Sequence, residues 1–151
     1  MKRRQTLPSE WLIVDRQPTA GLWRCIRSLP RGTGILLLCE LAAPARRYLR
    51  LLASVRELTI AEEAGGGAAR IHNMRELRRG LLRRSPLILL SPLYPTGSHP
   101  DWHALPRMRA AALARLAKRK AFALGGMNRE RYAKVAPLGF IGWAGISAFR
   151  T

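Results

Sequence analysis

A turn rich in hydrogen-bond donors follows the apolar run Leu87–Leu90, where the sequence reads LILLSPLYPTGSHP. Thr96 and Ser98 each carry a hydroxyl that can donate a hydrogen bond, and Gly97 between them lets the backbone turn sharply. His99 adds an imidazole, which is only partly charged at neutral pH. Donors of this kind suit an anionic ligand, and we expect a phosphate group to bind here.

Two later segments, ALGGMN and GWAGISAF, carry glycines in comparable positions after apolar runs. Gly125 and Gly126 would let the backbone approach a ligand and present its N–H groups. Gly145, followed closely by Ser147, would place more N–H donors at the start of a helical turn, where an anion is favoured. Each segment alone reads equally well as a turn or a cap, but three in series favour a phosphate site.

The elements that would position these donors alternate along the chain. Short apolar runs, typical of buried strands, are Trp11–Val14, Ile35–Leu41, Leu58–Ala61, Ala69–Ile71, Leu87–Leu90, Ala121–Leu124 and Phe140–Ala144. Helical patterns between them are Ala20–Leu29, Pro44–Val55, Met74–Arg84, Leu105–Arg119 and Asn128–Ala136. Alternation of this kind predicts an α/β fold with a parallel sheet, as a (β/α) barrel or as an open doubly wound sheet. In either fold, ligands bind where the strands end.

One helix is missing from the alternation. Gly65–Gly67 join two strand-like runs across a stretch too short for a helical crossover, which needs a dozen or more residues. The chain has 151 residues, whereas a complete eight-stranded barrel has about 250. We therefore predict a single domain over residues 1–151 that forms a shortened or incomplete TIM-type barrel of about seven strands.

Composition narrows the class of protein. Hydrophobic residues make up 48% of the chain, which is typical of a globular domain. No apolar run approaches the roughly 18 residues that span a bilayer, so we expect a cytoplasmic protein with no membrane partner and with Cys25 and Cys39 as free thiols. The formal net charge is +18, which favours a phosphate-bearing partner.

The three donor segments together resemble the thiamine phosphate synthase/TenI family. SPLYPTGSH, ALGGMNRERY and GWAGISAF are similar, in the same order, to family patterns of the type GPVFPTxT/SK, AIGGIxxxN and GVAVISAI. IHNMREL is similar to the family segment SxHxxxE, and the resemblance extends from Ile71 to Phe149. It implies a (β/α) barrel and a transferase that joins an aminopyrimidine pyrophosphate to a thiazole phosphate, releasing pyrophosphate with the help of Mg²⁺.

By this resemblance, Thr96 and Ser98 would hold the thiazole phosphate or the neighbouring pyrophosphate. A phosphate cup at the last two strands would be formed by Gly125, Gly126, Gly145 and Ser147. His99 stands where the family has a lysine that meets the leaving pyrophosphate, which makes it the catalytic candidate.

Other family motifs are replaced in this chain. The family's QxRxK motif after the second strand is absent, because LLLCEL offers Glu40 and no base. Glu62 and Glu63 stand where aspartates would hold Mg²⁺; they are candidate metal ligands or a solvated acidic turn. Pro92 lies where the TenI branch has a catalytic histidine, which disfavours TenI activity. His72, His99 and His103 lack metal-ligand spacing, and His72 is interpreted as a strand-end residue.

Three functions follow from these observations. The first is a thiamine phosphate synthase-like transferase, and the second is a catalytically silent relative that keeps the phosphate cup. The third is a basic nucleic-acid-binding protein on the same scaffold, although the aromatic residues are not interleaved with the bases as such binding usually requires. A lost βα unit would leave a sheet edge open, which predicts a homodimer that covers it.

Overall fold

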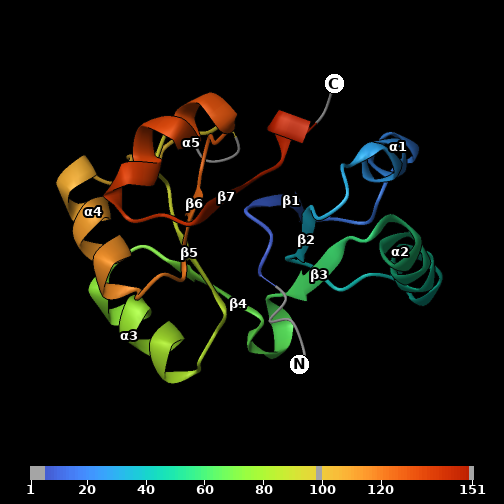
Figure 1. Ribbon diagram of the computed structural model, residues 1–151, viewed down its shortest axis with the longest axis horizontal. Coiled ribbons are helices and arrows are strands. Elements are labelled where there is room, and N and C mark those ends of the chain that lie inside the picture. The colour runs from blue at the N-terminus through green and yellow to red at the C-terminus, as the bar shows by residue number, and fades with distance from the viewer. Residues whose placement is uncertain (1–5, 98–99, 150–151) are drawn as a thin grey trace.

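The computed structural model describes residues 6–97 and 100–149, so two of the predicted site residues, Ser98 and His99, lie outside it. Strands and helices alternate along the described chain, as the sequence predicts (Figure 1). The strands are β1 (Glu10–Val14), β2 (Gly34–Leu37), β3 (Thr59–Glu62), β4 (Ala68–Ile71), β5 (Leu87–Leu90), β6 (Ala121–Leu124) and β7 (Gly142–Gly145). The helices are α1 (Ala20–Ser28), α2 (Ala43–Arg56), α3 (Met74–Leu82), α4 (Arg107–Leu116) and α5 (Arg129–Val135). None of them is long and apolar enough to cross a bilayer.

The strands form one seven-stranded parallel sheet in the order β3-β2-β1-β7-β6-β5-β4. This is the cyclic order of a (β/α) barrel in which the first and last strands of the chain are neighbours: Trp11 of β1 pairs with Ala144 of β7. Among the described strands, β3 and β4 form the two unpaired edges. The predicted shortened barrel is therefore confirmed, and the doubly wound alternative is not adopted. A single chain does not test the predicted homodimer.

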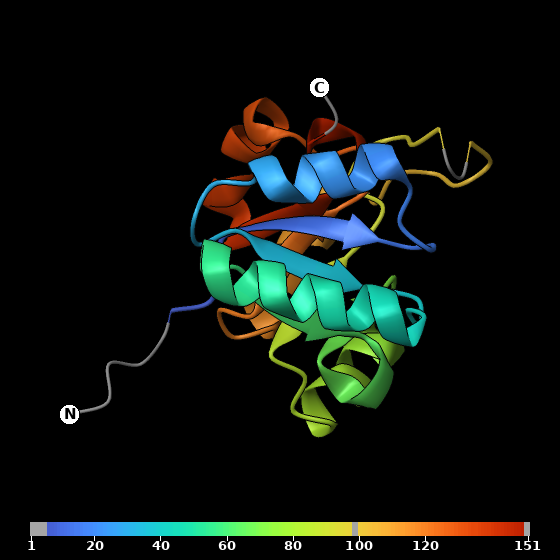
Figure 2. The same cartoon turned by 90° about the vertical axis from the view of Figure 1, so that its right-hand side faces the viewer.

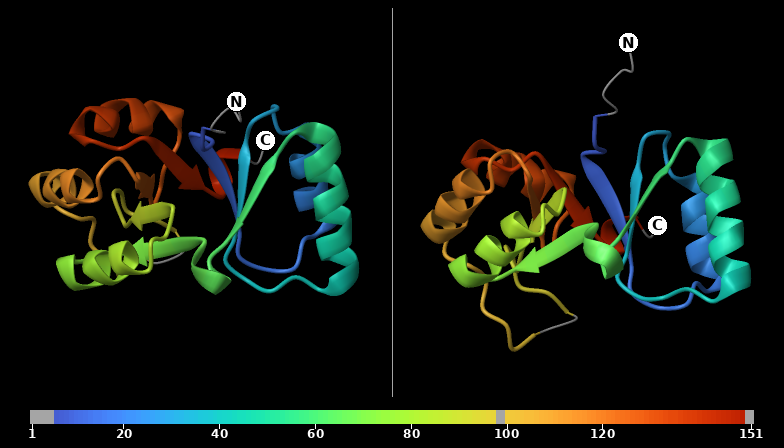
Figure 3. Two further views of the ribbon diagram at one scale, coloured as in Figure 1. Left: turned by 60° about the horizontal axis from the view of Figure 1, so that its bottom comes forward. Right: turned by 90° about the horizontal axis from the view of Figure 1, so that it is seen from below.

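The opening of the barrel lies where the sequence lacks a helix. Only the 3₁₀ turn Ala64–Gly66 connects β3 to β4, and the two strands diverge from it (Figure 3). Arg70 of β4 forms two hydrogen bonds to the carboxylate of Glu63, at 2.6 and 2.9 Å. A side-chain ion pair thus connects the two edges where a complete barrel would have another βα unit.

Helices cover the outer face of the curled sheet in two groups. α1 and α2 lie side by side against β1, β2 and β3 (Figure 2), where Ile26 and Leu49 are buried with outward-facing strand residues such as Leu12 and Ile35. α3, α4 and α5 cover β4 to β7 in the same way. The side chains that alternate with these face the barrel interior.

The interior at the amino ends of the strands is filled by two aromatic rings. Trp11 and Phe122 are buried and meet edge to face, with ring centroids 6.3 Å apart. Glycines on the neighbouring strands leave room for both rings. A Cβ on Gly34 would lie 2.3 Å from the Trp11 ring, and one on Gly142 would lie 2.7 Å from the Phe122 ring. Around these two rings, this end of the barrel is a packed apolar core.

Two helices begin at asparagine caps. The side chain of Asn73 accepts a hydrogen bond from the backbone of Glu76, and the side chain of Asn128 accepts one from Arg131, so each begins its helix. The predicted helix Leu105–Arg119 is shorter than expected. It begins after Pro106, which lies outside the helix as its cap residue, and it ends at Leu116. The predicted strand Ile35–Leu41 ends at Leu37, where the chain leaves the sheet for α2.

Candidate functional site

A cavity of about 760 Å³ opens at the carboxyl ends of the strands, at the end of the barrel opposite Trp11 and Phe122. Its apolar floor includes Ile13, Leu124 and Ile146. Polar side chains on its walls include Arg70, His72, Ser91, Thr96, Arg131 and Ser147. This is the end at which parallel α/β barrels place their active sites.

The structure brings three of the six predicted phosphate residues to this cavity. Thr96, Gly126 and Ser147 line it, and they come from the ends of three consecutive strands as predicted. Gly145 is the last residue of β7, and a 3₁₀ turn begins at Ser147, so the expected helical turn is present. The phosphate roles of these residues stay predictions.

Gly125 and Gly126 also allow a close approach between two backbone segments, which the sequence did not indicate. Both residues have positive φ, and a Cβ on either would lie 2.8 Å from the backbone of the loop that follows β5, at Pro92 and at Pro95. The backbone N–H of Tyr94 donates to the Gly125 carbonyl at 3.2 Å. The two glycines therefore let the loop that carries Thr96 lie directly on the end of β6.

Arg131 supplies a positive charge to the cavity wall. Its guanidinium lies over the ring of Tyr94, 4.7 Å from the ring centroid, and donates a hydrogen bond to the carbonyl of Gly126. These contacts hold the guanidinium beside Thr96's loop and the first turn of α5, where it can meet an anionic ligand. The place of Arg131 in the sequence, three residues after the helix cap Asn128, gave no sign that it would line the cavity.

The two carboxylates predicted as magnesium ligands are engaged elsewhere. Glu63 is bound by Arg70, and Glu62 forms an ion pair with Arg46 at 3.0 Å. Neither lines the main cavity, and the described residues contain no group of three or more His, Cys, Asp or Glu side chains that could hold a metal. Glu62 and Glu63 therefore do not fit a magnesium ion that serves this cavity.

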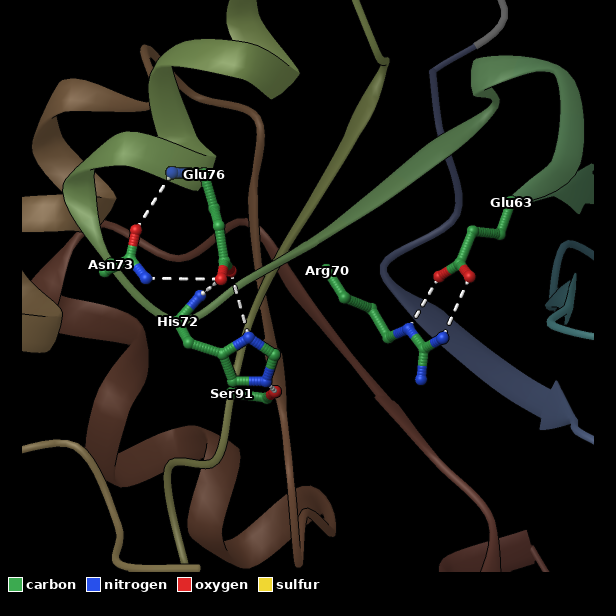
Figure 4. A network of polar contacts seen from close by, with 6 residues as sticks. All are labelled: Glu63, Arg70, His72, Asn73, Glu76 and Ser91. Atoms are coloured by element: carbon green, nitrogen blue, oxygen red, sulfur yellow. Dashed lines mark hydrogen bonds and ion pairs between the residues drawn. The ribbon is translucent and has the colours of Figure 1, made fainter.

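His72 lies between a carboxylate and a hydroxyl on the cavity wall (Figure 4). Its Nδ1 is 3.0 Å from Oε2 of Glu76, one turn into α3, and its Nε2 is 3.2 Å from Oγ of Ser91 at the end of β5. The ring of Trp102 meets the imidazole edge to face at 5.4 Å. His72 does lie at a strand end, as interpreted from the sequence, and it also takes part in a polar network that spacing along the chain does not reveal.

Glu76 is held in its ionised form. Partial burial alone would raise the pKa of this carboxyl, but hydrogen bonds from the backbone and ring of His72, with the charge of that ring, and from Asn73 lower the pKa below its ordinary value. An ionised carboxylate can only accept a hydrogen bond, so the proton between Glu76 and His72 lies on Nδ1. In the neutral ring, Nε2 is then the acceptor that faces the Ser91 hydroxyl.

A comparison with solved structures finds a thiamine phosphate pyrophosphorylase from Pyrococcus furiosus, which matches this chain with a TM-score of 0.69. The match covers 94% of this chain and 86% of that one, at 14% sequence identity. The chain has the fold of that enzyme. The resemblance seen in the sequence is thus matched at the level of the fold. No protein-family model and no curated protein sequence matches the chain.

Proposed function

We propose that the cavity binds a phosphorylated small molecule of the kind used in thiamine biosynthesis and that the chain is a thiamine phosphate synthase-like transferase. The observation that carries this proposal is the convergence of Thr96, Arg131 and Ser147 on one cavity at the carboxyl ends of the strands. Hydroxyl and guanidinium donors around a hollow suit a phosphate, and the fold is shared with a thiamine phosphate pyrophosphorylase.

The proposed roles follow the positions of the donors. Thr96 and Ser98 would hold one phosphate from the loop after β5, while backbone N–H groups near Gly126, Gly145 and Ser147 would hold it from the other side. Arg131 would neutralise charge on the bound phosphate, because a guanidinium binds phosphate oxygens in a fork. In a transferase reaction, the leaving pyrophosphate would meet His99 in place of the family's lysine. No step is assigned to a metal.

A second candidate is a relative that binds the phosphate without catalysis. It is favoured by the ion pairs that occupy Glu62 and Glu63, because a synthase of the family type needs carboxylates for Mg²⁺. A nucleic-acid partner is the third candidate and rests on the net charge of +18.

Calorimetry with thiazole phosphate tests the proposal, with and without pyrophosphate and Mg²⁺, on the wild-type chain and on Ser147→Ala. We expect binding that weakens at least tenfold in Ser147→Ala and is unchanged in the matched control Ser28→Ala, an exposed serine of α1. Tighter binding with pyrophosphate and Mg²⁺ would support the transferase, whereas indifference to both would support the silent relative. Absence of binding, together with steeply salt-dependent binding of a polynucleotide, would replace both with the nucleic-acid function.

A further inference from the structure

We propose that Ser91 is a nucleophile activated by His72 and Glu76, which gives this chain an acyl-transfer site for small carboxylic esters. The roles proposed above for phosphate binding do not include these three residues. The proposal rests on the order of the three groups: a hydroxyl, an imidazole and a carboxylate joined in series on the wall of a cavity.

The distances place the three groups in hydrogen-bond contact. Nε2 of His72 is 3.2 Å from the Ser91 hydroxyl, and Nδ1 of the same ring is 3.0 Å from the Glu76 carboxylate. This is the arrangement of a serine nucleophile with its general base and the group that orients the base. When the ring is neutral, the carboxylate keeps its proton on Nδ1, and the free electron pair of Nε2 then faces the hydroxyl.

The sheet holds the nucleophile and the base in register. Ile71 of β4 pairs with Leu90 of β5, so His72 and Ser91 are the next residues on two adjacent strands. The backbone N–H of Ser91 donates to the carbonyl of Ile71 at 3.1 Å, which extends the ladder to this point. A site on paired strand ends is more rigid than one on loops, as a nucleophile and its base require.

Helix capping explains only part of the network. The backbone N–H of His72 donates to Glu76 Oε2 at 2.8 Å, and Asn73 Nδ2 donates to the other carboxylate oxygen at 3.2 Å. These two bonds stabilise the start of α3 with any side chain at position 72. The contact of the imidazole with Ser91 adds nothing to that cap, so it calls for another explanation.

Ser91 borders two hollows. Ser91 is 5% exposed, but it lines both the main cavity and a side hollow of about 390 Å³. The side hollow is bordered by Pro92, Trp102 and Leu105, whose apolar surfaces suit a short acyl chain. The Trp102 ring against His72 also reduces contact of the base with water.

The proposed reaction is a two-step transfer. Oγ of Ser91 forms a bond to the ester carbonyl carbon while its proton passes to Nε2 of His72. The ester C–O bond breaks, and the departing alcohol takes that proton from Nε2. A water molecule, activated by the same Nε2, then cleaves the acyl-serine to release the carboxylic acid and restore the hydroxyl.

The test uses a small fluorophosphonate, whose phosphorus accepts the bond from an activated serine oxygen as fluoride leaves. Incubation of the full chain, followed by intact mass and peptide mapping, should show one adduct on Ser91. His72→Gln should slow the labelling about 100-fold or more, since a general base contributes 10²–10⁴-fold. Ser91→Ala should abolish it, and the matched control Ser28→Ala should label at the wild-type rate.

Three outcomes would overturn the proposal: no adduct on the wild-type chain, an adduct mapped to another residue, or labelling of His72→Gln at the wild-type rate. Circular dichroism on each variant shows whether it folds, and mapping on the wild-type chain stands even if a variant does not. Glu76 is a positioning residue here. Glu76→Gln should slow labelling more than tenfold at unchanged helix content, a loss that a purely capping role would not cause.

Discussion

The two ends of the barrel interior are built from the same strands and have opposite characters. At the amino ends, Trp11 and Phe122 fill the space, and glycines on neighbouring strands make room for them. At the carboxyl ends, the interior opens into a cavity with charged and hydroxyl-bearing walls. Apolar packing therefore fills one end and polar side chains line the other, which is the end that carries active sites in complete barrels.

The change from buried apolar residues to polar residues of the cavity wall occurs along single strands. On β5, the inward-facing residues run from Leu87 through Leu89, both buried, to Ser91 on the cavity wall. On β4, Ala68 is buried inside the barrel, and Arg70, two residues later, reaches the cavity. Because inward positions recur every second residue, two steps along a strand are enough to pass from core to site.

The largest effect is expected from filling the packed end. Gly34→Val would place a Cβ 2.3 Å from the buried Trp11 ring, and we expect a loss of about 3 kcal/mol in the free energy of unfolding, measured with urea. Trp11→Leu in the same chain should recover part of the loss by removing the ring. Gly21→Ala, where the nearest atom is 3.8 Å away, is the control and should leave stability unchanged or slightly higher. Equal stability of Gly34→Val and wild type would contradict the packed-core account.

An intermediate effect is expected at the open end, on binding more than on stability. Arg131→Leu should weaken binding of inorganic pyrophosphate about 10- to 100-fold, because a hydrogen bond to a charged group contributes about 1.5–3 kcal/mol. The loss of stability should stay near 1 kcal/mol, from the contact with Tyr94. Arg109→Leu removes the same formal charge from an exposed position on α4. This control separates binding by Arg131 in the cavity from the effect of the overall positive charge of the protein. Equal weakening in both variants would mean that the cavity does not hold the anion.

The smallest effect is expected in the pH dependence of the free energy of unfolding, through Glu76 at the open end. The pKa of Glu76 is lowered in the folded chain, so its stabilising contribution is complete above its ordinary value of 4.5. That contribution is lost as the pH falls through the lowered pKa. Glu76→Gln should therefore be less stable than wild type at neutral pH, and the gap in unfolding free energy should narrow below pH 4.5. A gap that stays constant down to pH 3 would show that the hydrogen bonds at Glu76 do not depend on its ionisation.

Most of the fold could be predicted from periodicity. The runs Leu87–Leu90 and Ala121–Leu124 matched their strands residue for residue, because they are buried on both faces and end at turn residues. The glycines after Glu63 revealed the missing unit for a simple reason: five residues cannot hold a crossover helix. Helix ends were less accurate, since Pro106 reads equally as a cap residue or as a first helical residue.

Residues of the candidate site could be predicted only where they stand in short segments that resemble known motifs. Thr96 and Ser147 stood in short recognisable segments, and both line the cavity. Arg131 and the link from His72 to Ser91 depend on which strands are neighbours and which way side chains face, and neither is visible from spacing alone. Glu62 and Glu63 show the reverse case: their residue type suggested metal, and only the structure reveals the arginines that engage them.

The pairing of β1 with β7 has a consequence for how the chain is made. Trp11 pairs with Ala144, so the first of the seven described strands pairs with the last of them in chain order. The other ladders of the sheet join strands that are near one another in sequence, but this ladder closes the loop from Trp11 to Ala144, and contacts of such long range form slowly. During translation, the edge of β1 that pairs with β7 stays unpaired until Gly142–Gly145 have been synthesised. Ser147 stands two residues after the end of β7, so this part of the cavity wall is formed at nearly the same time as the β1–β7 ladder.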